Sequence, residues 1–231
     1  MDLNKIYSFI LSQSSNQNDP KILLKDILTL YNFIYSKAGS VAVQYGNGTH
    51  PKHRLTKYHD FFVNNIDENE SVLDLGSGRG DVTYDVAKKT CGEVAGLESN
   101  SSNFLYATRT YVKPNLHFMR GDIYGDIPRR HFDVVILSNV LEHLKFRVNI
   151  LKNIIESNTP KRILIRVPYF ERDWTVAMKK ELGIPYFLDD THEIEYTHEE
   201  FYKEIAGAGL EVTSAIFKWG EIWAVCKIKE K

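Results

Sequence analysis

The chain has 231 residues, which suits one large domain or a domain with a small cap, and it is long enough to bury a full core. Hydrophobic residues make up 43% and charged residues 26% of the sequence, the averages of globular domains, so disordered and collagen-like chains are excluded. Lys plus Arg is 29 and Asp plus Glu is 30, and the formal charge of −1 disfavours a general nucleic-acid binder, which needs excess positive charge.

The sequence also lacks the features of a membrane or secreted protein. No apolar run approaches the roughly 18 residues of a membrane helix, and the N-terminal residues include Asp2 and no cleavage site of small residues. The two cysteines, Cys91 and Cys226, belong to no metal-binding motif. We therefore expect a cytoplasmic protein that is not inserted into a membrane.

Helical periodicity predicts a helical N-terminal segment over residues 1–70. Leu, Ile, Phe and Tyr recur at helical spacing over 3–12 and 21–37, and Asp19-Pro20 is typical of a helix start. Gly39 is expected to interrupt the chain after the second of these helices.

A third helix is expected to begin near Pro51, after the turn formed by Gly46-Asn47-Gly48. One side of this helix is predicted to be apolar through Leu55, Tyr58, Phe62 and Ile66. We expect the whole segment to act as a cap or lid for a second domain over residues 71–231.

From residue 71 onward, short β-branched runs alternate with helical patterns, which is typical of a parallel sheet with crossover helices. Five strands are expected at 72–75, 93–97, 116–119, 133–137 and 162–167. Helices are expected between them at roughly 80–90, 101–111 and 144–157.

The C-terminal part of the pattern begins with a segment rich in aromatic and charged residues, 169–197, which is predicted to be an insertion. A helix at about 198–207, capped by Gly207 or Gly209, follows it. The runs at 210–219 and 221–227 predict an antiparallel hairpin at the end of the sheet. The fold class expected is therefore α/β, with a mostly parallel sheet of seven strands.

The segment VLDLGSGRGD, residues 72–81, predicts a strand, a glycine loop and a helix. Such a loop lies at the carboxyl edge of the sheet, where α/β proteins bind ligands. Its GxGxG spacing differs from the GxGxxG of dinucleotide folds, and Asp81 stands where a P-loop needs lysine. Asp74, two residues before the first glycine, would repel a phosphate and suits a ligand with a positive charge.

Two further acidic residues are expected at the same edge. Glu98 ends the second predicted strand and could accept hydrogen bonds from the two hydroxyls of a ribose. Asp122 and Ile123 follow the third strand, where a carboxylate and an apolar contact could hold an adenine.

Together these motifs resemble the class I S-adenosylmethionine-dependent methyltransferases, in particular the small-molecule subgroup similar to quinone-biosynthesis enzymes. The glycine loop with Asp74, the acidic end of strand 2, the GD pair of Gly121 and Asp122, and FDVVILSNVLEHL at 132–144 occur in the family's order over residues 71–227. The resemblance implies a Rossmann-like fold with helices on both faces of the sheet, and S-adenosyl-L-methionine as cofactor. The cofactor-binding residues that it implies are Asp74, Gly76, Ser77, Gly78, Gly80, Glu98, Ser99, Asp122, Ile123 and Asn139.

The methyl acceptor is expected to be a small molecule. Ser138-Asn139-Val140-Leu141 lacks the prolines of an N-P-P-Y type motif, and neither cysteine lies where a cytosine-methylating nucleophile would be needed, so DNA is disfavoured as the acceptor. His143 and His192 are candidate general bases, because an imidazole titrates near neutral pH; each could instead only hold a loop. The candidate acceptor-binding residues are Arg166, Tyr169 and Asp173.

Basic and histidine residues are concentrated at 50–59 in the presumed lid. This stretch is either a solvent-facing basic helix or a lid in which Arg54 or Tyr58 contacts the methionine carboxylate of the cofactor or a phosphate of the acceptor. Its histidines, His50, His53 and His59, have no fixed carboxylate partner in the sequence, so no metal site is expected.

The predicted function is methyl transfer from S-adenosylmethionine to an oxygen of a sugar or of a nucleotide-linked or phosphorylated sugar precursor. One alternative is an RNA or protein methyltransferase, which would need an additional recognition surface. Another is a cofactor-binding subunit without catalytic activity. The sequence predicts neither the oligomeric state nor the atom that is methylated.

Overall fold

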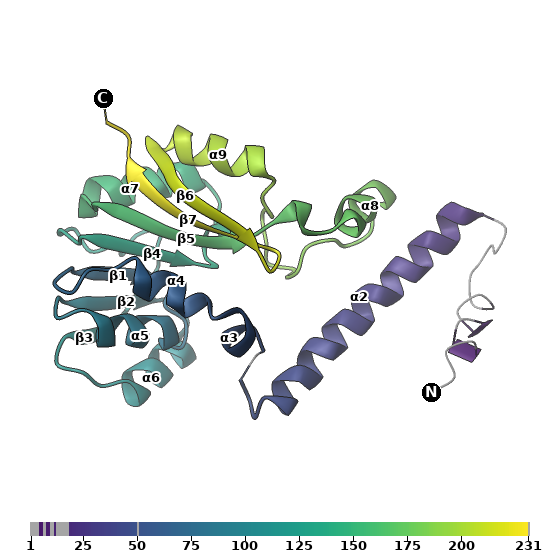
Figure 1. The fold of residues 1–231 in the computed structure, drawn as a ribbon, viewed down its shortest axis with the longest axis horizontal. Helices are drawn as coiled ribbons and strands as arrows, with labels where there is room; N and C mark the ends of the chain where they lie inside the picture. Colours follow the sequence, from purple (N-terminus) through teal and green to yellow (C-terminus); the bar gives the residue numbers. More distant parts are fainter. Residues whose placement is uncertain (1–4, 7, 10–11, 13–18, 50, 231) are drawn as a thin grey trace. The chain divides into compact units, whose positions relative to one another are not determined.

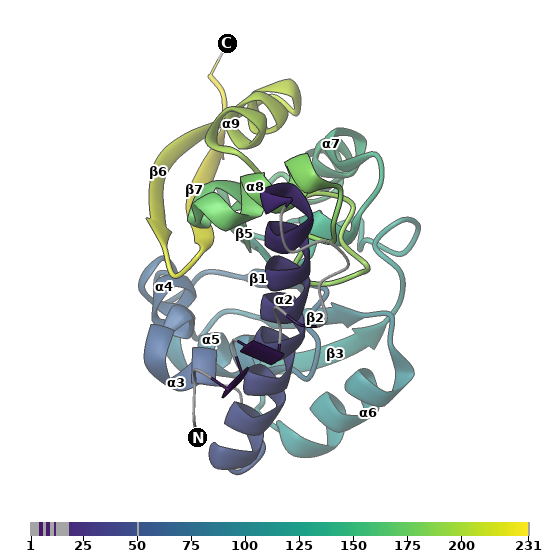
Figure 2. The same ribbon diagram turned by 90° about the vertical axis from the view of Figure 1, so that its right-hand side faces the viewer.

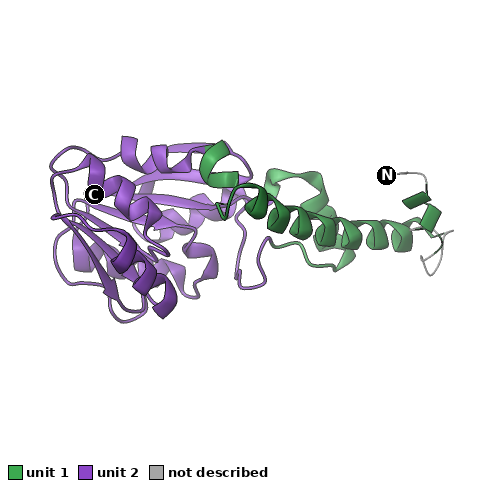
Figure 3. Ribbon diagram, turned by 90° about the horizontal axis from the view of Figure 1, so that it is seen from below, with its two compact units in different colours: residues 1–56, 171–187 green, residues 57–170, 188–231 purple. Residues whose placement is uncertain are grey.

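A computed structural model describes residues 5–6, 8–9, 12, 19–49 and 51–230 (Figure 1). The chain divides into two compact units, coloured separately in Figure 3. The first comprises residues 1–56 and 171–187, and the second comprises 57–170 and 188–231. Half of the predicted helix at 3–12, together with His50, lies outside the described residues.

The second unit is built on a seven-stranded sheet in the order β3-β2-β1-β4-β5-β7-β6. The first five strands are parallel, and β7 pairs antiparallel with β5 and with β6. The strands are β1 (Val72–Leu75), β2 (Val94–Glu98), β3 (Leu116–Arg120), β4 (Val134–Ser138), β5 (Arg162–Pro168), β6 (Leu210–Lys218) and β7 (Glu221–Ile228). This arrangement confirms the predicted Rossmann-like α/β fold with its C-terminal hairpin.

Helices cover both faces of this sheet because the central strands are apolar on both sides. Helices α4 (Tyr58–Asn64) and α5 (Asp81–Lys89) pack on one face, and α7 (Arg147–Asn158) and α9 (His198–Gly207) pack on the other (Figure 1). Helix α6 (Ser101–Thr110) lies beside β3 at the edge of the sheet (Figure 2). Each crossover helix returns the chain to the start of the next strand, so the loops that can bind a ligand gather at one edge.

The first unit contains α2 (Pro20–Tyr45), α3 (Pro51–Thr56) and α8 (Trp174–Leu182). The predicted start of α2 is confirmed, because the Asp19 side chain accepts a hydrogen bond from Lys21 N–H and Pro20 occupies the first turn. Leu28 of α2 packs with Leu182 and Ile184 in a small apolar cluster. None of the helices formed by the described residues has the length and apolar character of a membrane span.

Three sequence expectations about the helices were wrong. Gly39 does not interrupt α2, which continues for 26 residues to Tyr45. The single helix expected from Pro51 is two helices, because Lys57 between them has φ 51°. Leu55 is 56% exposed, so it does not share a buried side with Tyr58, Phe62 and Ile66, which are buried. In addition, the segment 169–197 contains helix α8, which was not predicted.

Candidate functional site

The candidate site lies where the strand order of the sheet reverses. Strand β1 pairs with β2 on one side and with β4 on the other, so the loops after β1 and β4 flank this point. Ligands of open α/β sheets bind there, outside the carboxyl ends of the strands. The two loops touch: a Cβ on Gly76 would lie 2.7 Å from Cγ2 of Val140.

The loop after β1 depends on three glycines with positive φ, at 71° for Gly76, 57° for Gly78 and 83° for Gly80. Gly80 leads into α5 and is packed tightly, because a Cβ there would lie 2.7 Å from the Phe118 ring. Gly78 is different, since a Cβ there would meet no atom within 4 Å. Between Gly76 and Gly78, the buried Ser77 Oγ has no hydrogen-bond partner. The middle of the loop therefore offers open space and an unused polar atom.

The Glu98 carboxylate, at the end of β2, is held against this loop. Oε2 accepts a hydrogen bond from Gly78 N–H at 2.8 Å, and Oε1 accepts one from Asn100 N–H at 2.7 Å. The residue is only 7% exposed. Each carboxylate oxygen can accept a second hydrogen bond, so the group can still bind a pair of hydroxyls. Ser99, the next residue, is exposed.

Asp122 and Ile123 begin the loop after β3. The exposed Asp122 carboxylate accepts a hydrogen bond from Tyr124 N–H at 2.9 Å, and Asp122 N–H donates to Asp126 Oδ2 at 2.8 Å. Ile123 is half-buried against the core. The loop is thus fixed by its own hydrogen bonds, and the Asp122 carboxylate lies at the surface.

Asp74 lies inside β1, directly before the glycine loop, and it is 1% exposed. Its Oδ2 accepts a hydrogen bond from the Thr83 hydroxyl of α5 at 2.6 Å. Burial, together with the charge of Glu98, raises the pKa of Asp74 to about 7, although the Thr83 hydrogen bond and His59 act in the opposite direction. A cation close to this carboxyl would favour its ionised form.

The loop after β4 begins with Asn139, which has φ 56°. Its N–H donates to Arg166 O of β5 at 2.7 Å, which holds the residue in this left-handed conformation. Its buried side-chain Oδ1 has no hydrogen-bond partner. Asn139 therefore provides a second unused polar atom at the switch point, in addition to Ser77 Oγ.

Arg166 and Tyr58, which the sequence assigned to different ligands, are in contact. The Arg166 guanidinium lies 3.7 Å from the centre of the Tyr58 ring. It also donates two hydrogen bonds, both 2.7 Å, to the carboxylate of Glu221 on β7. Burial is the main cause that raises the pKa of Tyr58 to about 12. Through these contacts Arg166 joins β5, β7 and α4.

His143 and His192 lie together, with ring centroids 4.7 Å apart. His143 lies in a short 3-10 helix after β4, and His192 comes from the loop before α9. Glu193 N–H donates to the Glu142 carbonyl at 2.7 Å and thereby ties the two segments together. Burial and the neighbouring His192 lower the pKa of His143 below its usual value, so this imidazole is neutral near pH 7.

Other residues singled out in the sequence are not members of this cluster. Arg54 and Asp173 belong to the first unit, where Arg54 is exposed and Asp173 caps α8 by accepting Thr175 N–H at 2.7 Å. Tyr169 is half-buried and packs on the Phe217 ring, with centroids 5.1 Å apart. His59 Nδ1 contacts Asp85 Oδ2 at 2.5 Å, a carboxylate partner that its sequence neighbours did not reveal.

Four residues of the site were missed from the sequence alone. Thr83 hydrogen bonds to Asp74, Glu221 pairs with Arg166, and Glu195 contacts His192 Nδ1 through Oε1 at 3.0 Å. The fourth, Glu142, directly precedes His143 and is 0% exposed. Of these four residues, only Glu142 had a signal in the sequence, because it lies in the apolar run NVLEHL. A glutamate in such a run is expected to be buried, and a buried carboxylate usually has a partner.

The sequence matches the model of a family described as methyltransferase domain over residues 48–215. No curated protein sequence matches the chain. In structure, the chain is similar to a chain of the complex between the Trm112 methyltransferase activator of Haloferax volcanii and a methyltransferase, with 15% identity and a TM-score of 0.62, covering 78% of this chain and 94% of that one.

Two other similar structures are named for different substrates. The small RNA methyltransferase HEN1 has 14% identity and a TM-score of 0.62, covering 76% of this chain and 25% of that one. Magnesium protoporphyrin IX methyltransferase from Synechocystis PCC 6803, with bound S-adenosylhomocysteine, has 12% identity and a TM-score of 0.56, covering 98% of this chain and 94% of that one. At such identities the likeness concerns the fold.

Proposed function

The chain belongs to the methyltransferase-domain family and is an S-adenosylmethionine-dependent methyltransferase, and from this premise we propose that it methylates an oxygen of a small-molecule acceptor. The leading acceptor class is a sugar, or a nucleotide-linked or phosphorylated sugar precursor. The observation that carries the proposal is the pair His143 and His192 beside the end of β4, because hydroxyl acceptors need a group that assists proton removal.

The glycine loop and its neighbours fit the cofactor. Ser77 Oγ and Asn139 Oδ1 are buried polar atoms without a hydrogen-bond partner, and Gly78 leaves open space where a side chain would block a ligand. We assign the ribose hydroxyls to Glu98, whose carboxylate oxygens each accept only one backbone amide. Asp74 would supply negative charge near the cationic part of the cofactor.

The remaining residues of the proposed cofactor site are assigned by their place at the strand ends. Asp122 and Ile123 would hold the adenine by a hydrogen bond and an apolar contact, and the exposed Ser99 would line its edge. We propose that Tyr58 supports the cofactor site indirectly, because its ring is buried and packs on Arg166. We also propose that Arg54 contacts the carboxylate of the cofactor or a phosphate of the acceptor.

When bound, S-adenosylmethionine supplies a methyl group on a sulfonium that a nucleophilic oxygen can attack. The protein's own contribution is to align the acceptor and to assist the loss of its hydroxyl proton. His143 is suited to this because it is neutral near pH 7, and His192 lies beside it. We further propose that Tyr169 and Arg166 shape the acceptor side, with Arg166 acting through its neighbours, and that Asp173 contributes from the insertion.

The experiment is a screen of acceptors with cofactor labelled in its methyl group. Nucleotide sugars, phosphosugars, phenols, small amines and short RNAs are each incubated with the full chain. We expect label on a sugar hydroxyl, and a kcat that falls about 10²–10⁴-fold in His143→Ala or His192→Ala with little change in cofactor affinity. His131→Ala, at the amino end of β4, is the matched control and should keep its kcat.

Transfer to amines or RNA alone would overturn the acceptor class, and a fall in kcat of only a few-fold would reassign the histidines to positioning.

We also propose that the protein works in the cytoplasm. This is supported by its cysteines, since exposed Cys91 and buried Cys226 are both free thiols, as is usual in a reducing compartment.

A further inference from the structure

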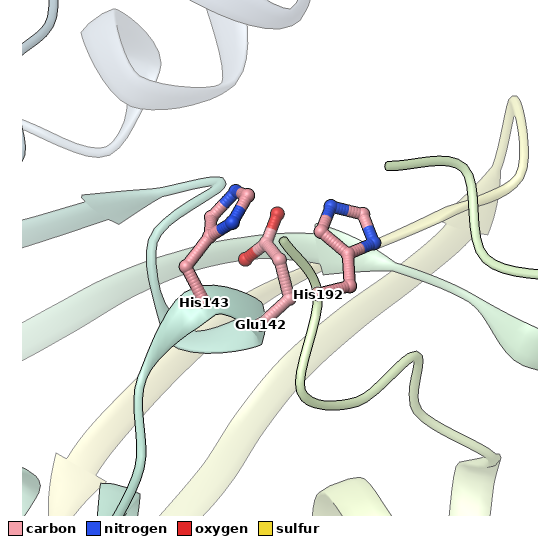
Figure 4. Close-up of side chains that lie close together, drawn as sticks. All are labelled: Glu142, His143 and His192. Atoms are coloured by element: carbon pink, nitrogen blue, oxygen red, sulfur yellow. The ribbon is translucent and has the colours of Figure 1, made fainter. Parts of the chain in front are cut away.

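Three side chains at the end of β4 form a cluster with the composition of a metal site. Glu142, His143 and His192 each offer a ligand atom, and these atoms all lie within 4.8 Å of one another. Figure 4 shows the Glu142 carboxylate between the two imidazole rings. The cluster differs from the histidines at 50–59, for which the sequence predicted no metal site.

Hydrogen bonds orient both rings in the same way. The Thr191 hydroxyl donates to Asp189 Oδ1 at 2.6 Å, so its oxygen accepts the proton of His143 Nδ1, 2.9 Å away. His192 Nδ1 lies 3.0 Å from the Glu195 carboxylate, which can only accept. With Nδ1 bound in this way, Nε2 is the nitrogen of each ring that is left to bind an ion. Histidines that bind metals usually donate their other N–H to a carboxylate or similar acceptor, as these two do.

The third member, Glu142, is unsatisfied within the protein. The residue is 0% exposed, and both its carboxylate oxygens are buried without a hydrogen-bond partner. A buried carboxylate without a partner costs several kcal/mol if it is ionised, so its presence needs an explanation. Its backbone carbonyl is bound by Glu193 N–H at 2.7 Å, which anchors the His192 segment beside the side chain. The molecule thus builds the cluster with local bonds but leaves its carboxylate open.

We infer that Glu142, His143 and His192 bind a divalent transition-metal ion. Two imidazoles and one carboxylate suit zinc, manganese, iron or cobalt, whereas calcium and magnesium prefer sets made wholly of oxygen. Three protein ligands leave coordination positions for water or for an oxygen of the acceptor, and this second role rests on the proposed function. The ion would then polarise the acceptor hydroxyl, and the two histidines would assist the loss of its proton as ligands of the ion, in place of acting as free bases.

The test titrates Mn²⁺, Zn²⁺ and Mg²⁺ into the full chain after chelator treatment, by calorimetry. We expect one Mn²⁺ or Zn²⁺ ion per chain, with weaker binding of Mg²⁺. Glu142→Gln and His192→Asn should each weaken Mn²⁺ binding at least about tenfold, whereas His131→Asn should not change it. Thr191→Val removes only the partner of His143 and should weaken binding less than the ligand variants. No ion bound, or equal affinity in Glu142→Gln and the native chain, would overturn the inference.

A second measurement needs no variant. Nitrogen NMR of the histidine side chains follows the eight imidazoles of the native chain as Zn²⁺ is added. Two rings should shift at Nε2 while keeping a proton on Nδ1, and a pattern with no such pair contradicts the site. Binding of S-adenosylhomocysteine is measured in parallel. If it fails while the metal binds, the proposed function falls and the metal site stands; the reverse result removes the metal site alone.

Discussion

Asp74 combines deep burial with a single hydrogen bond from a neutral group. The Thr83 hydroxyl is 2.6 Å from Oδ2, and the residue is 1% exposed. Burial is the largest cause that raises its pKa to about 7, far above the usual value for aspartate. Without a cation beside it, this carboxyl is therefore largely protonated in slightly acidic solution, and a positively charged ligand beside it would favour its ionised form.

This shift predicts how the free energy of unfolding depends on pH. The folded protein holds the Asp74 proton up to about pH 7, whereas the unfolded chain loses it near 3.8, the ordinary pKa of an aspartate. Stability contributed by the protonated group is thus lost as pH rises between these values, by about 1.4 kcal/mol for each unit of pKa difference. Denaturant unfolding at pH 5 and pH 7.5 should show a larger decline in the native chain than in Asp74→Asn. Equal declines would contradict the raised pKa.

At the residue scale, the sequence identified the residues with reactive side chains better than it predicted the contacts of those side chains. Asp74, Glu98 and Asp122 were located at strand ends, and the structure places them there. Arg166 was predicted to line the acceptor site, yet it is 5% exposed and paired with Glu221. That pair forms because β5 and β7 are antiparallel neighbours, and the partner lies 55 residues away. Periodicity carries no information on such a pairing.

Within the glycine loop, Gly78 and Gly80 serve different purposes, which gives a prediction for the loop as an element. Gly80→Ala adds a Cβ 2.7 Å from Phe118 at a φ of 83°, so we expect a loss of about 2–3 kcal/mol in unfolding free energy. Gly78→Ala meets no atom within 4 Å and should cost only the backbone strain, about 1 kcal/mol. Gly78→Ala should instead weaken the binding of S-adenosylhomocysteine, which calorimetry measures.

Equal losses of stability in the two variants would show that the loop is packed uniformly and has no open centre. Unchanged ligand affinity in Gly78→Ala would show that the ligand does not approach this part of the loop. Together the two variants separate a glycine required by packing from one required by ligand access.

Most helices and strands were predicted within a few residues, because apolar periodicity and caps specify them locally. The exceptions have physical reasons. Gly39 costs a helix only about 1 kcal/mol relative to alanine, which the long α2 tolerates. Lys57 adopts φ 51° at the boundary between the compact units, a break that no local residue signals. Helix α8 did carry signals, the Asp173 cap and Gly183 with φ 67°, among aromatic residues that obscured its period.

At the scale of the whole molecule, the alternation of strands and helices predicted a mostly parallel sheet with a C-terminal hairpin, since parallel crossovers leave few arrangements. The structure confirms this sheet; its strand order and the switch point between β1 and β4 were not predicted. The cluster of Glu142, His143 and His192 did not follow, because His192 reaches it from a segment about fifty residues further along the chain, with no regular structure to predict its path. The role of residues 1–70 as a lid stays a prediction.

The central claim is that this chain binds the adenosyl cofactor at the glycine loop through Glu98. Calorimetric titration of the full chain with S-adenosylhomocysteine tests it most directly. We predict one site per chain and a loss of about 1–3 kcal/mol of binding free energy in Glu98→Ala, because a charged acceptor of hydrogen bonds is removed. Glu93→Ala, at the opposite end of β2, should bind like the native chain. No detectable binding, or the same affinity in Glu98→Ala as in the native chain, would contradict the account.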